Sequence, residues 1–354
     1  MSKLTIVIPT YNRHKYLLRS IKYWSDCDVD VIILDGGSSA LEELSLKKLP
    51  PNISYHHLPI GILERLKIAS NLIKTKYSIL LGDDEFFIPS ALNSAIKSLD
   101  SDPELVACCG QSLGFWPGKL RSWTPKKKIL LSYIVYPERK FYLPNHNDSQ
   151  HRMNEHMENF SPNGIYAVVR SPEWKKIISI IAEETFSVHA LFELQFELAI
   201  SFFGKTKILD ELFWIRSAEN KGIPFEGDIS FERWWTDPNK SLERLRFLQI
   251  TADGLSNANT SATDIIEYLT ESLNSYLKFS NASELSYLTK LKNNLFISLP
   301  DKLQIILKNI LLYQGIGKPF EENVRKMIKS GTKVNSVELQ EIERLVLEFH
   351  NIDK

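Results

Sequence analysis

The sequence predicts an α/β fold: a mixed, mostly parallel sheet with helices on both faces, followed by an all-helical C-terminal domain. Two observations lead to this prediction. In the first half of the 354-residue chain, short apolar runs alternate with helical patterns, as expected when crossover helices join parallel strands. Beyond about residue 235 the pattern is helical throughout. We therefore expect two domains, residues 1–235 and residues 236–354.

Four apolar runs predict the first strands. Strands are expected at Leu4–Ile8, Val29–Leu34, Ile53–Leu58 and Tyr77–Leu81, and helices at Lys15–Trp24, Ile62–Ile73 and Pro89–Leu99. Nearly continuous apolar runs are typical of parallel strands that are buried on both faces. Ligands of such sheets bind outside the carboxyl ends of the strands, so the polar residues directly after Ile8, Leu34 and Leu81 are candidates for a site.

The middle of the chain is less regular. A strand is expected at Leu105–Cys109, and residues 110–164, rich in Trp, Tyr, Pro, Lys and His, predict long loops with one hairpin. Regular elements then return: a strand at Gly164–Arg170, helices at Pro172–Ile181 and His189–Phe203, and a strand-like stretch at Lys207–Ile215.

The C-terminal part predicts a series of helices. They are expected at Thr263–Phe279, Ser283–Leu295, Asp301–Tyr313, Phe320–Lys329 and Val337–Phe349. Asn335 and Glu338 have the spacing of a helix N-terminus with a capping box. The stretch Leu299–Gly317 is apolar enough to contact a membrane surface or a partner helix, although a buried helix is the favoured interpretation. Homo-oligomer formation through these helices also stays open.

Composition narrows the class of protein. The chain is 43% hydrophobic and has 43 basic and 43 acidic residues, so no net charge directs it to nucleic acid. Cys27, Cys108 and Cys109 have neither disulfide nor metal spacing, and one of the adjacent pair is expected to be less buried. The sequence shows no secretory leader and no membrane-spanning run, so we expect a cytoplasmic protein. Peripheral contact with the inner face of a membrane stays an open alternative.

The most informative chemistry lies at Asp83-Asp84-Glu85, directly after an apolar strand. Three consecutive carboxylates repel one another and are costly to desolvate unless a cation compensates them. Mg²⁺ and Mn²⁺ use one or two protein carboxylates together with substrate phosphates. A solvated turn that caps the following helix is the alternative.

His146, His151 and His156 lack the spacing of a zinc site and are expected to be exposed or in acceptor loops.

Several motifs together carry a resemblance to a known family. IVIPTYNR ends at Arg13, ILDGGSS contains Asp35, and Gly61 and Arg65 precede KYSILLGDDEF. In order and spacing, about the first 220 residues resemble a family-2 type glycosyltransferase with the Rossmann-like GT-A fold. The resemblance implies a nucleotide-diphosphate sugar as donor. It also implies a divalent metal, Mn²⁺ or Mg²⁺, held on the diphosphate by an acidic "DxD" motif.

The resemblance assigns roles to particular residues. It implies that the base and ribose pocket is lined by Pro9, Thr10, Tyr11, Asn12 and Arg13. Asp35 would hydrogen-bond the base or ribose, Gly61 would allow close approach of the nucleotide, and Arg65 would lie near it. Arg216, in a stretch that resembles the closing strand and basic loop of the family, would stabilise the departing diphosphate.

The register of the acidic motif is ambiguous by one residue. The family form commonly begins with Asp where this chain has Gly82. Asp83 and Glu85 are the outer carboxylates of the triplet, and Asp84 is the alternative metal ligand. Asp83 is also a candidate contact of the nucleotide.

An inverting transfer needs a carboxylate to take the proton of the acceptor hydroxyl. The family supplies it from an acidic pair, often Glu-Asp, at the start of a helix. The corresponding helix here carries Glu193 and Glu197, one turn apart on one face. Glu193 is favoured because it is nearer the helix start. A solvated glutamate stripe is the alternative.

We therefore expect a metal-dependent, inverting glycosyltransferase that acts on a glycan, lipid-linked or other hydroxyl acceptor. A catalytically silent GT-A-like module that binds a nucleotide or glycan within a polysaccharide-assembly complex is the rival hypothesis. The missing Glu-Asp pair favours that rival, and the acidic triplet disfavours it.

Overall fold

One mixed sheet forms the centre of the molecule. The computed structural model describes residues 2–118, 129–137, 145–162, 164–220, 229–292 and 318–352. The sheet has the strand order β10-β7-β6-β8-β4-β1-β2-β3, and β9 pairs with β6 and β5 beside this path. Its parallel part consists of β1 (Leu4–Thr10), β2 (Asp30–Asp35), β3 (Ile53–His57) and β4 (Tyr77–Leu80). The mostly parallel arrangement expected for this half of the chain is confirmed.

The other half of the sheet is largely antiparallel. It contains β5 (Phe86–Phe87), β6 (Leu105–Gly118), β7 (Ile129–Val135), β8 (Val168–Arg170), β9 (Lys205–Ser217) and β10 (Lys318–Pro319). The short strand β8 pairs antiparallel with both β4 and β6 and so joins the two halves. β9 runs parallel to β6, so its far end reaches the same edge as the ends of β1, β2 and β4.

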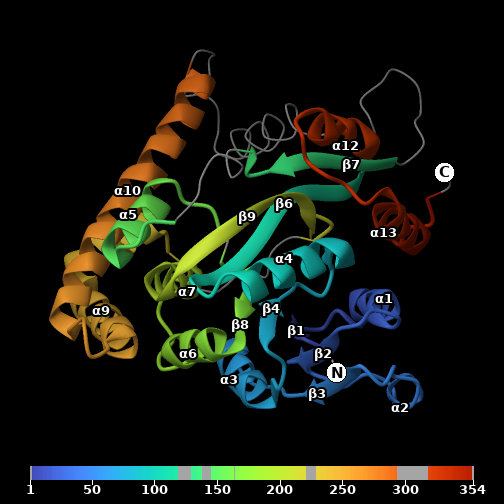
Figure 1. Ribbon diagram of the computed structural model, residues 1–354, viewed down its shortest axis with the longest axis horizontal. Helices are drawn as coiled ribbons and strands as arrows, with labels where there is room; N and C mark the ends of the chain where they lie inside the picture. The colour runs from blue at the N-terminus through green and yellow to red at the C-terminus, as the bar shows by residue number, and fades with distance from the viewer. Residues whose placement is uncertain are drawn as a thin grey trace.

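Helices cover both faces of the sheet (Figure 1). The N-terminal part contributes α1 (His14–Trp24), α2 (Glu43–Leu46), α3 (Ile62–Leu72), α4 (Pro89–Ser101), α6 (Ser171–Ile181) and α7 (Leu191–Phe203). α3 packs against β2 and α6, and α4 packs against β6 and β9. Pro89 begins α4 at a position where the missing N–H costs nothing.

A second group of helices flanks α7. It consists of α5 (Ser149–Glu158), α8 (Phe231–Thr236), α9 (Ser241–Leu255) and the long α10 (Ala262–Lys292). α10 runs along α5 and α9 at one end of the molecule (Figure 1). The buried Arg152 of α5 donates from Nε to the carbonyl oxygen of Ser201 and from NH2 to that of Phe202. It therefore binds carbonyls that the last turn of α7 leaves unpaired.

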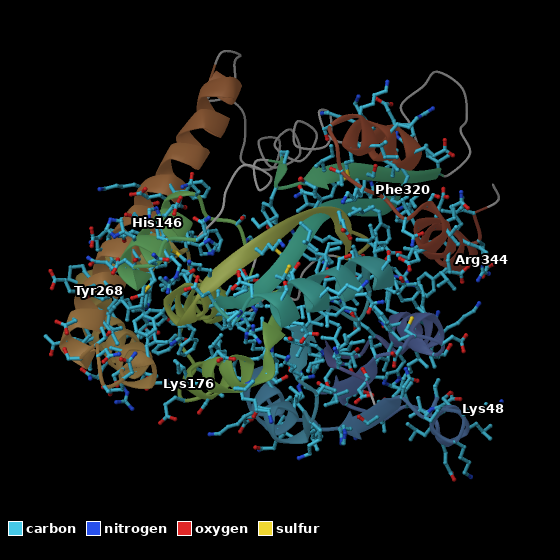
Figure 2. The ribbon with its side chains drawn as sticks, in the orientation of Figure 1. Lys48, His146, Lys176, Tyr268, Phe320 and Arg344 are labelled. Atoms are coloured by element: carbon cyan, nitrogen blue, oxygen red, sulfur yellow. The ribbon has the colours of Figure 1, made fainter. Side chains whose placement is uncertain are left out.

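The last two helices pack on the opposite end of the sheet. α12 (Phe320–Lys329) lies on β7, with Phe320 buried (Figure 2). Asn323 donates to both the carbonyl and the hydroxyl oxygen of Ser132. α13 (Ser336–Phe349) packs on α1. The domain boundary near residue 235 stays a prediction. Within the described residues, no helix is long and apolar enough to cross a membrane.

Three predictions about elements and one about burial were wrong. β6 does not end at Cys109 but continues to Gly118 as one arm of the expected hairpin. Gly114 allows this pairing because the Tyr133 ring lies across the strand at that position. A Cβ at Gly114 would be 2.1 Å from the Tyr133 side chain. α5 replaces part of the predicted loop. The helix expected to begin at Ser283 is a continuation of α10.

The fourth concerns the cysteines, since Cys108 and Cys109 are both fully buried. The capping prediction is confirmed for Asn335, whose side chain accepts from the N–H groups of Val337 and Glu338. Glu338 itself binds Ser90 instead of completing the box. The helix at 301–313 and the apolar stretch at 299–317 lie outside the described residues.

Candidate functional site

The candidate site lies where the parallel strands end. Thr10 is the last residue of β1, Asp35 is the last residue of β2, and the two are register partners. The turn from Gly82 to Glu85 follows β4, with the N–H of Glu85 donating to the carbonyl of Gly82. Three segments that are far apart in the sequence therefore meet at one edge, as the sequence predicts.

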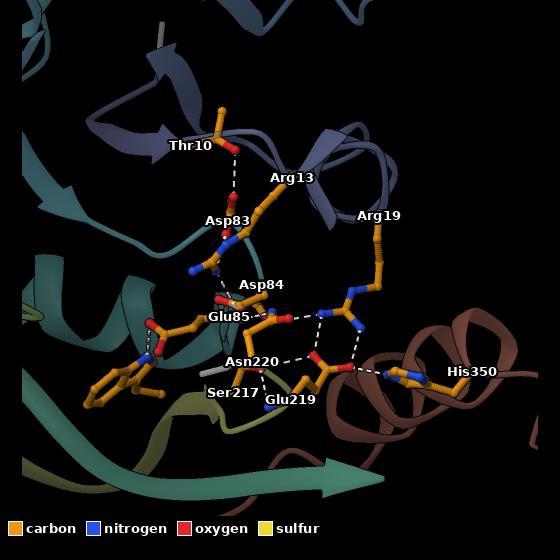
Figure 3. A network of polar contacts seen from close by, with 11 residues as sticks. Thr10, Arg13, Arg19, Asp83, Asp84, Glu85, Ser217, Glu219, Asn220 and His350 are labelled. Carbon is orange, nitrogen blue, oxygen red and sulfur yellow. Dashed lines mark hydrogen bonds and ion pairs between the residues drawn. The ribbon is translucent and has the colours of Figure 1, made fainter. Parts of the chain in front are cut away.

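Asp83 is bound to the end of β1 (Figure 3). Its Oδ2 accepts from the Thr10 hydroxyl at 2.5 Å, and its Oδ1 accepts from Arg13 NH1 at 3.2 Å. Burial and the neighbouring Asp84 raise the pKa of Asp83 to about 6, against the opposing effect of Thr10 and Arg13. This carboxyl therefore gains from any further positive charge.

Asp84 and Glu85 have separate partners. Asp84 Oδ2 accepts from the Asn220 amide at 2.7 Å and lies 3.5 Å from Arg13 NH1. Glu85 Oε2 accepts from Trp214 Nε1 at 3.0 Å. Burial, and after it the charge of Asp84, raises the pKa of Glu85 to about 8.

Gly82 stands where the family commonly has Asp, and the structure gives a reason for this difference. A Cβ at Gly82 would lie 3.1 Å from Cδ of Glu85, so a larger side chain at position 82 would displace the Glu85 carboxylate.

The acidic turn fits a cation that arrives with a ligand. Within the described residues, no group of three or more His, Cys, Asp or Glu side chains is arranged to hold a metal by itself. However, Mg²⁺ and Mn²⁺ need only one or two protein carboxylates when phosphates complete the shell. Burial first, and the charge of Asp84 second, raise the pKa values of Asp83 and Glu85, so the ionised forms of these carboxyls are unfavourable without a cation. A divalent cation would favour those ionised forms.

Asp35 is fully buried and already has several partners. It accepts from the Gly37 N–H at 2.8 Å and from the Tyr55 hydroxyl at 2.6 Å, and it lies 3.1 Å from His14 Nε2. Asn12, in the left-handed region at φ 55°, accepts from the N–H of Ser38 at 2.9 Å. The loops after β1 and β2 are thus tied to each other.

Arg65 lies behind this edge. Its NH1 donates to the carbonyl oxygens of Thr10 and Leu34 at 2.8 and 2.7 Å. A Cβ at Gly36 would be only 2.5 Å from the guanidinium carbon, so only glycine leaves room for it. Gly61 is the N-cap of α3, and its N–H donates to the carboxylate of Glu64.

Arg216 projects from the end of β9 on the other side of the acidic turn. Its guanidinium lies over the Trp214 ring, 5.5 Å from the centroid, and donates to the Tyr136 hydroxyl. Burial alone lowers its pKa, but Tyr136, Tyr133 and Glu85 outweigh this and raise it. Arg216 is therefore a permanent cation near Glu85.

The two candidate bases have different surroundings. Glu193 is partly buried in the first turn of α7 and accepts no hydrogen bond from the residues that the structure describes. Burial first, and Glu197 second, raise its pKa, while Arg216 lowers it. Its charge also acts on the partly buried Tyr166, whose pKa is raised mainly by burial.

Glu197 is fully buried and fully engaged. It accepts from the N–H groups of Gly164 and Ile165 at 2.9 and 3.0 Å, and its Oε2 lies 2.8 Å from His156 Nε2.

The expectation of exposed or loop histidines is wrong for His156, which is buried on α5. It holds for His146 and His151, whose rings stack at the surface.

An open cavity of about 510 Å³ adjoins the acidic turn. It is lined by Asn12, Arg13, His14, Lys15, Tyr16, Ser39 and Asn220. Two of these residues, Arg13 and Asn220, contact Asp84. A second cavity, of about 460 Å³, lies between the start of α3 at Gly61 and the segment around His189.

Residues 5–160 match the sequence profile of Glycosyl transferase family 2. This part of the chain belongs to that family. The GT-A fold implied by the resemblance is confirmed, with its mixed sheet and its helical C-terminal region. No curated protein matches the sequence.

Solved structures of S. aureus TarS resemble this chain. The crystal structure of S. aureus TarS 1–349 is 14% identical, with a TM-score of 0.48, over 86% of this chain and 78% of that one. TarS 1–349 in complex with UDP-GlcNAc is 15% identical, with a TM-score of 0.49, over 78% and 73%. At these scores the likeness carries no conclusion about donor or acceptor.

The sequence did not reveal several residues of the candidate site. Trp214 binds Glu85, and Tyr166 stacks on its ring at a centroid distance of 4.0 Å. Asn220 reaches Asp84. For Trp214 and Asn220 the only signal was their proximity to Arg216 in the sequence, whereas Tyr166 and Arg19 lie far from it.

Proposed function

We propose that the protein moves a sugar from a nucleotide-diphosphate sugar to a hydroxyl acceptor. The observation that carries this proposal is the acidic turn, which is buried against Thr10 and Arg13 at the carboxyl edge of a family-2 domain. A turn that only capped α4 would be solvated, but Asp83, Asp84 and Glu85 are each less than a tenth exposed.

The donor diphosphate would lie between the acidic turn and nearby cations. Arg13 and Lys15 line the adjoining cavity, and Arg216 stands on the other side of Glu85. Asp35 is already engaged by Tyr55, Gly37 and His14, so we infer that it acts on the nucleotide by orienting the loop after β2. Pro9 and Tyr11 complete the proposed base and ribose pocket, and Tyr11 is about half exposed.

Asp83, Asp84 and Glu85 would hold Mn²⁺ or Mg²⁺ together with diphosphate oxygens. When bound, the cation would neutralise charge on the diphosphate leaving group. Arg13 and Arg216 add positive charge of their own, which favours departure of the nucleoside diphosphate.

Glu193 is our proposed general base. The acceptor hydroxyl would give its proton to the Glu193 carboxylate while its oxygen forms a bond to the anomeric carbon. The bond from that carbon to the diphosphate breaks, and the nucleoside diphosphate leaves with the electron pair. One displacement of this kind inverts the anomeric centre. Glu197 is the weaker candidate, because all of its surroundings are protein.

The acceptor stays a glycan, a lipid-linked sugar or another hydroxyl compound. We also propose a cytoplasmic location, with three free cysteines typical of a reducing compartment. Peripheral membrane contact and a homo-oligomer through the C-terminal helices are proposals that rest on the sequence alone.

A specific observation favours the silent module as a second candidate. Every carboxylate of the acidic turn already has a protein partner: Thr10 and Arg13 for Asp83, Asn220 for Asp84, and Trp214 for Glu85. A site used only for binding could keep these contacts permanently.

A panel of nucleotide sugars with Mn²⁺ or Mg²⁺ tests both candidates. We expect one donor to raise the unfolding temperature of the wild type and to be hydrolysed slowly, and we expect both effects to be lost in Asp84→Asn. Asp100→Asn, which removes an exposed partner of Lys3 and Lys76 far from the site, should behave as the wild type. Stabilisation without turnover, even with added acceptors, would support the silent module. No stabilisation by any donor would refute the transferase and a nucleotide-binding module alike.

A further inference from the structure

The end of the C-terminal helix reaches the glycosyltransferase site. His350, directly after α13, binds the Glu219 carboxylate through Nε2. The Glu219 side chain has no exposed surface. It also accepts from the hydroxyl of Ser217, which in turn accepts from the Glu219 N–H. More than 100 residues of sequence thus separate two side chains that form one contact.

Arg19 completes this contact from α1 (Figure 3). Its NH1 and NH2 donate to the two carboxylate oxygens of Glu219 at 2.9 and 2.6 Å. The bidentate geometry fixes the orientation of both planar groups. The hydrogen bonds and charges of His350 and Arg19 hold the pKa of Glu219 below its ordinary value, although burial alone would raise it.

Aromatic rings from three elements enclose the Arg19 guanidinium. Its carbon lies 4.6 Å from the ring centroid of Phe349, 5.1 Å from that of Tyr16 and 5.2 Å from that of Phe86. Phe349 is the last residue of α13, and Phe86 directly follows the acidic turn. The arginine therefore has one orientation open to it.

This orientation determines contacts on two sides of Asp84. Arg19 NH2 also donates to the Asp84 carbonyl oxygen at 3.0 Å. Asn220, the residue after Glu219, donates to Asp84 Oδ2 at 2.7 Å. The buried ion pair of Arg19 and Glu219 consequently positions both the backbone carbonyl of Asp84 and the Asn220 amide that binds the Asp84 side chain.

We propose that Arg19, Glu219 and His350 form a positioning unit for the donor site, so that the end of α13 is needed to orient Asp84 and Asn220 toward the diphosphate. The inference rests on the proposed function. None of the three residues touches the donor. Each acts through Asp84 or Asn220, as residues behind a metal or phosphate site commonly do.

Binding of UDP, GDP and TDP in the presence of MnCl₂, measured by calorimetric titration, tests this unit. We expect His350→Phe, which keeps a ring beside Phe349 but loses the imidazole nitrogen, to weaken the diphosphate that the wild type binds by about tenfold or more. Glu219→Gln should weaken it at least as much. His350→Gln, which keeps a hydrogen-bond donor, should recover part of the loss.

Glu338→Gln is the matched control. Glu338 holds the same helix by accepting from the N–H and hydroxyl of Ser90, but it has no contact with the Arg19 pair. It should lower the unfolding temperature and leave the affinity close to that of the wild type.

Two results would overturn the inference: wild-type affinity in His350→Phe, or an equal loss in Glu338→Gln, which would mean that any loosening of α13 has the same effect. If Glu219→Gln does not fold, His350→Phe decides. Absence of binding by the wild type itself would refute the proposed function, and the positioning unit with it.

Discussion

The two glutamates of α7 differ in their surroundings although they lie one turn apart. Glu197 is an anchor, since its carboxylate holds the N–H groups of Gly164 and Ile165. Glu193 has a raised pKa and accepts no hydrogen bond from the described residues. A carboxylate with spare acceptor capacity and a raised pKa has the properties expected of a general base.

Glu193→Gln should lower kcat for sugar transfer by about 10²–10⁴-fold with little change in the affinity for the donor, because the amide cannot take a proton. Glu197→Gln should instead lower the unfolding temperature, because a buried acceptor of backbone N–H groups is altered. Steady-state kinetics and thermal denaturation of both variants separate these roles. Equal kcat in Glu193→Gln and the wild type would exclude Glu193 as the base.

The pH profile provides a second check on the same residue. Burial, and then Glu197, raise the pKa of Glu193 above its ordinary value of 4.5. A base works only when it is deprotonated, so kcat/KM should fall as pH drops through this raised pKa. The midpoint of the acidic limb should therefore lie above 4.5, and Glu197→Gln should move it to lower pH. A limb that does not respond to Glu197→Gln would contradict this assignment.

At the scale of elements, the strands and the loops differ in how far sequence predicts them. The apolar runs of β1, β2 and β4 fixed both their positions and the edge at which Thr10, Asp35 and Asp83 meet. When a side chain is buried by a segment that is distant in the sequence, the local sequence pattern does not predict the burial. The imidazole of His156 is buried only because Glu197 and α10 lie against α5.

The same limit applies to the candidate site. Arg65 is expected near the nucleotide, and its NH1 donates to the carbonyls of Thr10 and Leu34 behind the edge. Sequence spacing predicts that a residue lies near the carboxyl edge of the sheet. It does not tell whether the side chain lines the pocket or supports the loops that form it. Trp214 and Asn220 were missed because each is joined to the acidic turn only by a long-range hydrogen bond.

Gly36→Ala should weaken nucleotide binding by displacing Arg65. The added Cβ would lie 2.5 Å from the Arg65 guanidinium carbon, and an overpacked site of this kind typically costs about 1–3 kcal/mol. Ser70→Ala is the control, because it removes only an exposed hydroxyl that donates to the Lys67 carbonyl within α3. Calorimetric titration and urea denaturation of the two variants should differ accordingly, and similar behaviour of both would argue against a role for Arg65.

At the scale of the whole molecule, the C-terminal helices are part of the sheet domain's surface. β10 extends the sheet beside β7, α12 covers β7, and Tyr16 of α1 packs on Phe349 with centroids 4.8 Å apart. α10, by contrast, packs on α5 and α9 at the other end. Segments that follow residue 235 thus pack on the sheet itself at one end and on the helices α5, α6 and α7 at the other.

Removal of residues 318–354 should lower the unfolding temperature, because it uncovers β7 and α1 and deletes the hydrogen bonds from Asn323 to Ser132. Differential scanning calorimetry of the truncated and full chains measures the effect. An unchanged transition would show that these helices are an independent unit that contributes nothing to the sheet.

The stack of Tyr166 on Trp214 gives the protein a built-in optical reporter. The indole is shielded from solvent, lies against a phenol ring and donates its N–H to a carboxylate of the acidic turn. Any event that changes the charge or the position of Glu85 alters the electric field on that indole. Intrinsic emission can therefore follow occupancy of this edge of the sheet in real time, with Trp214→Phe identifying its share of the signal from seven tryptophans.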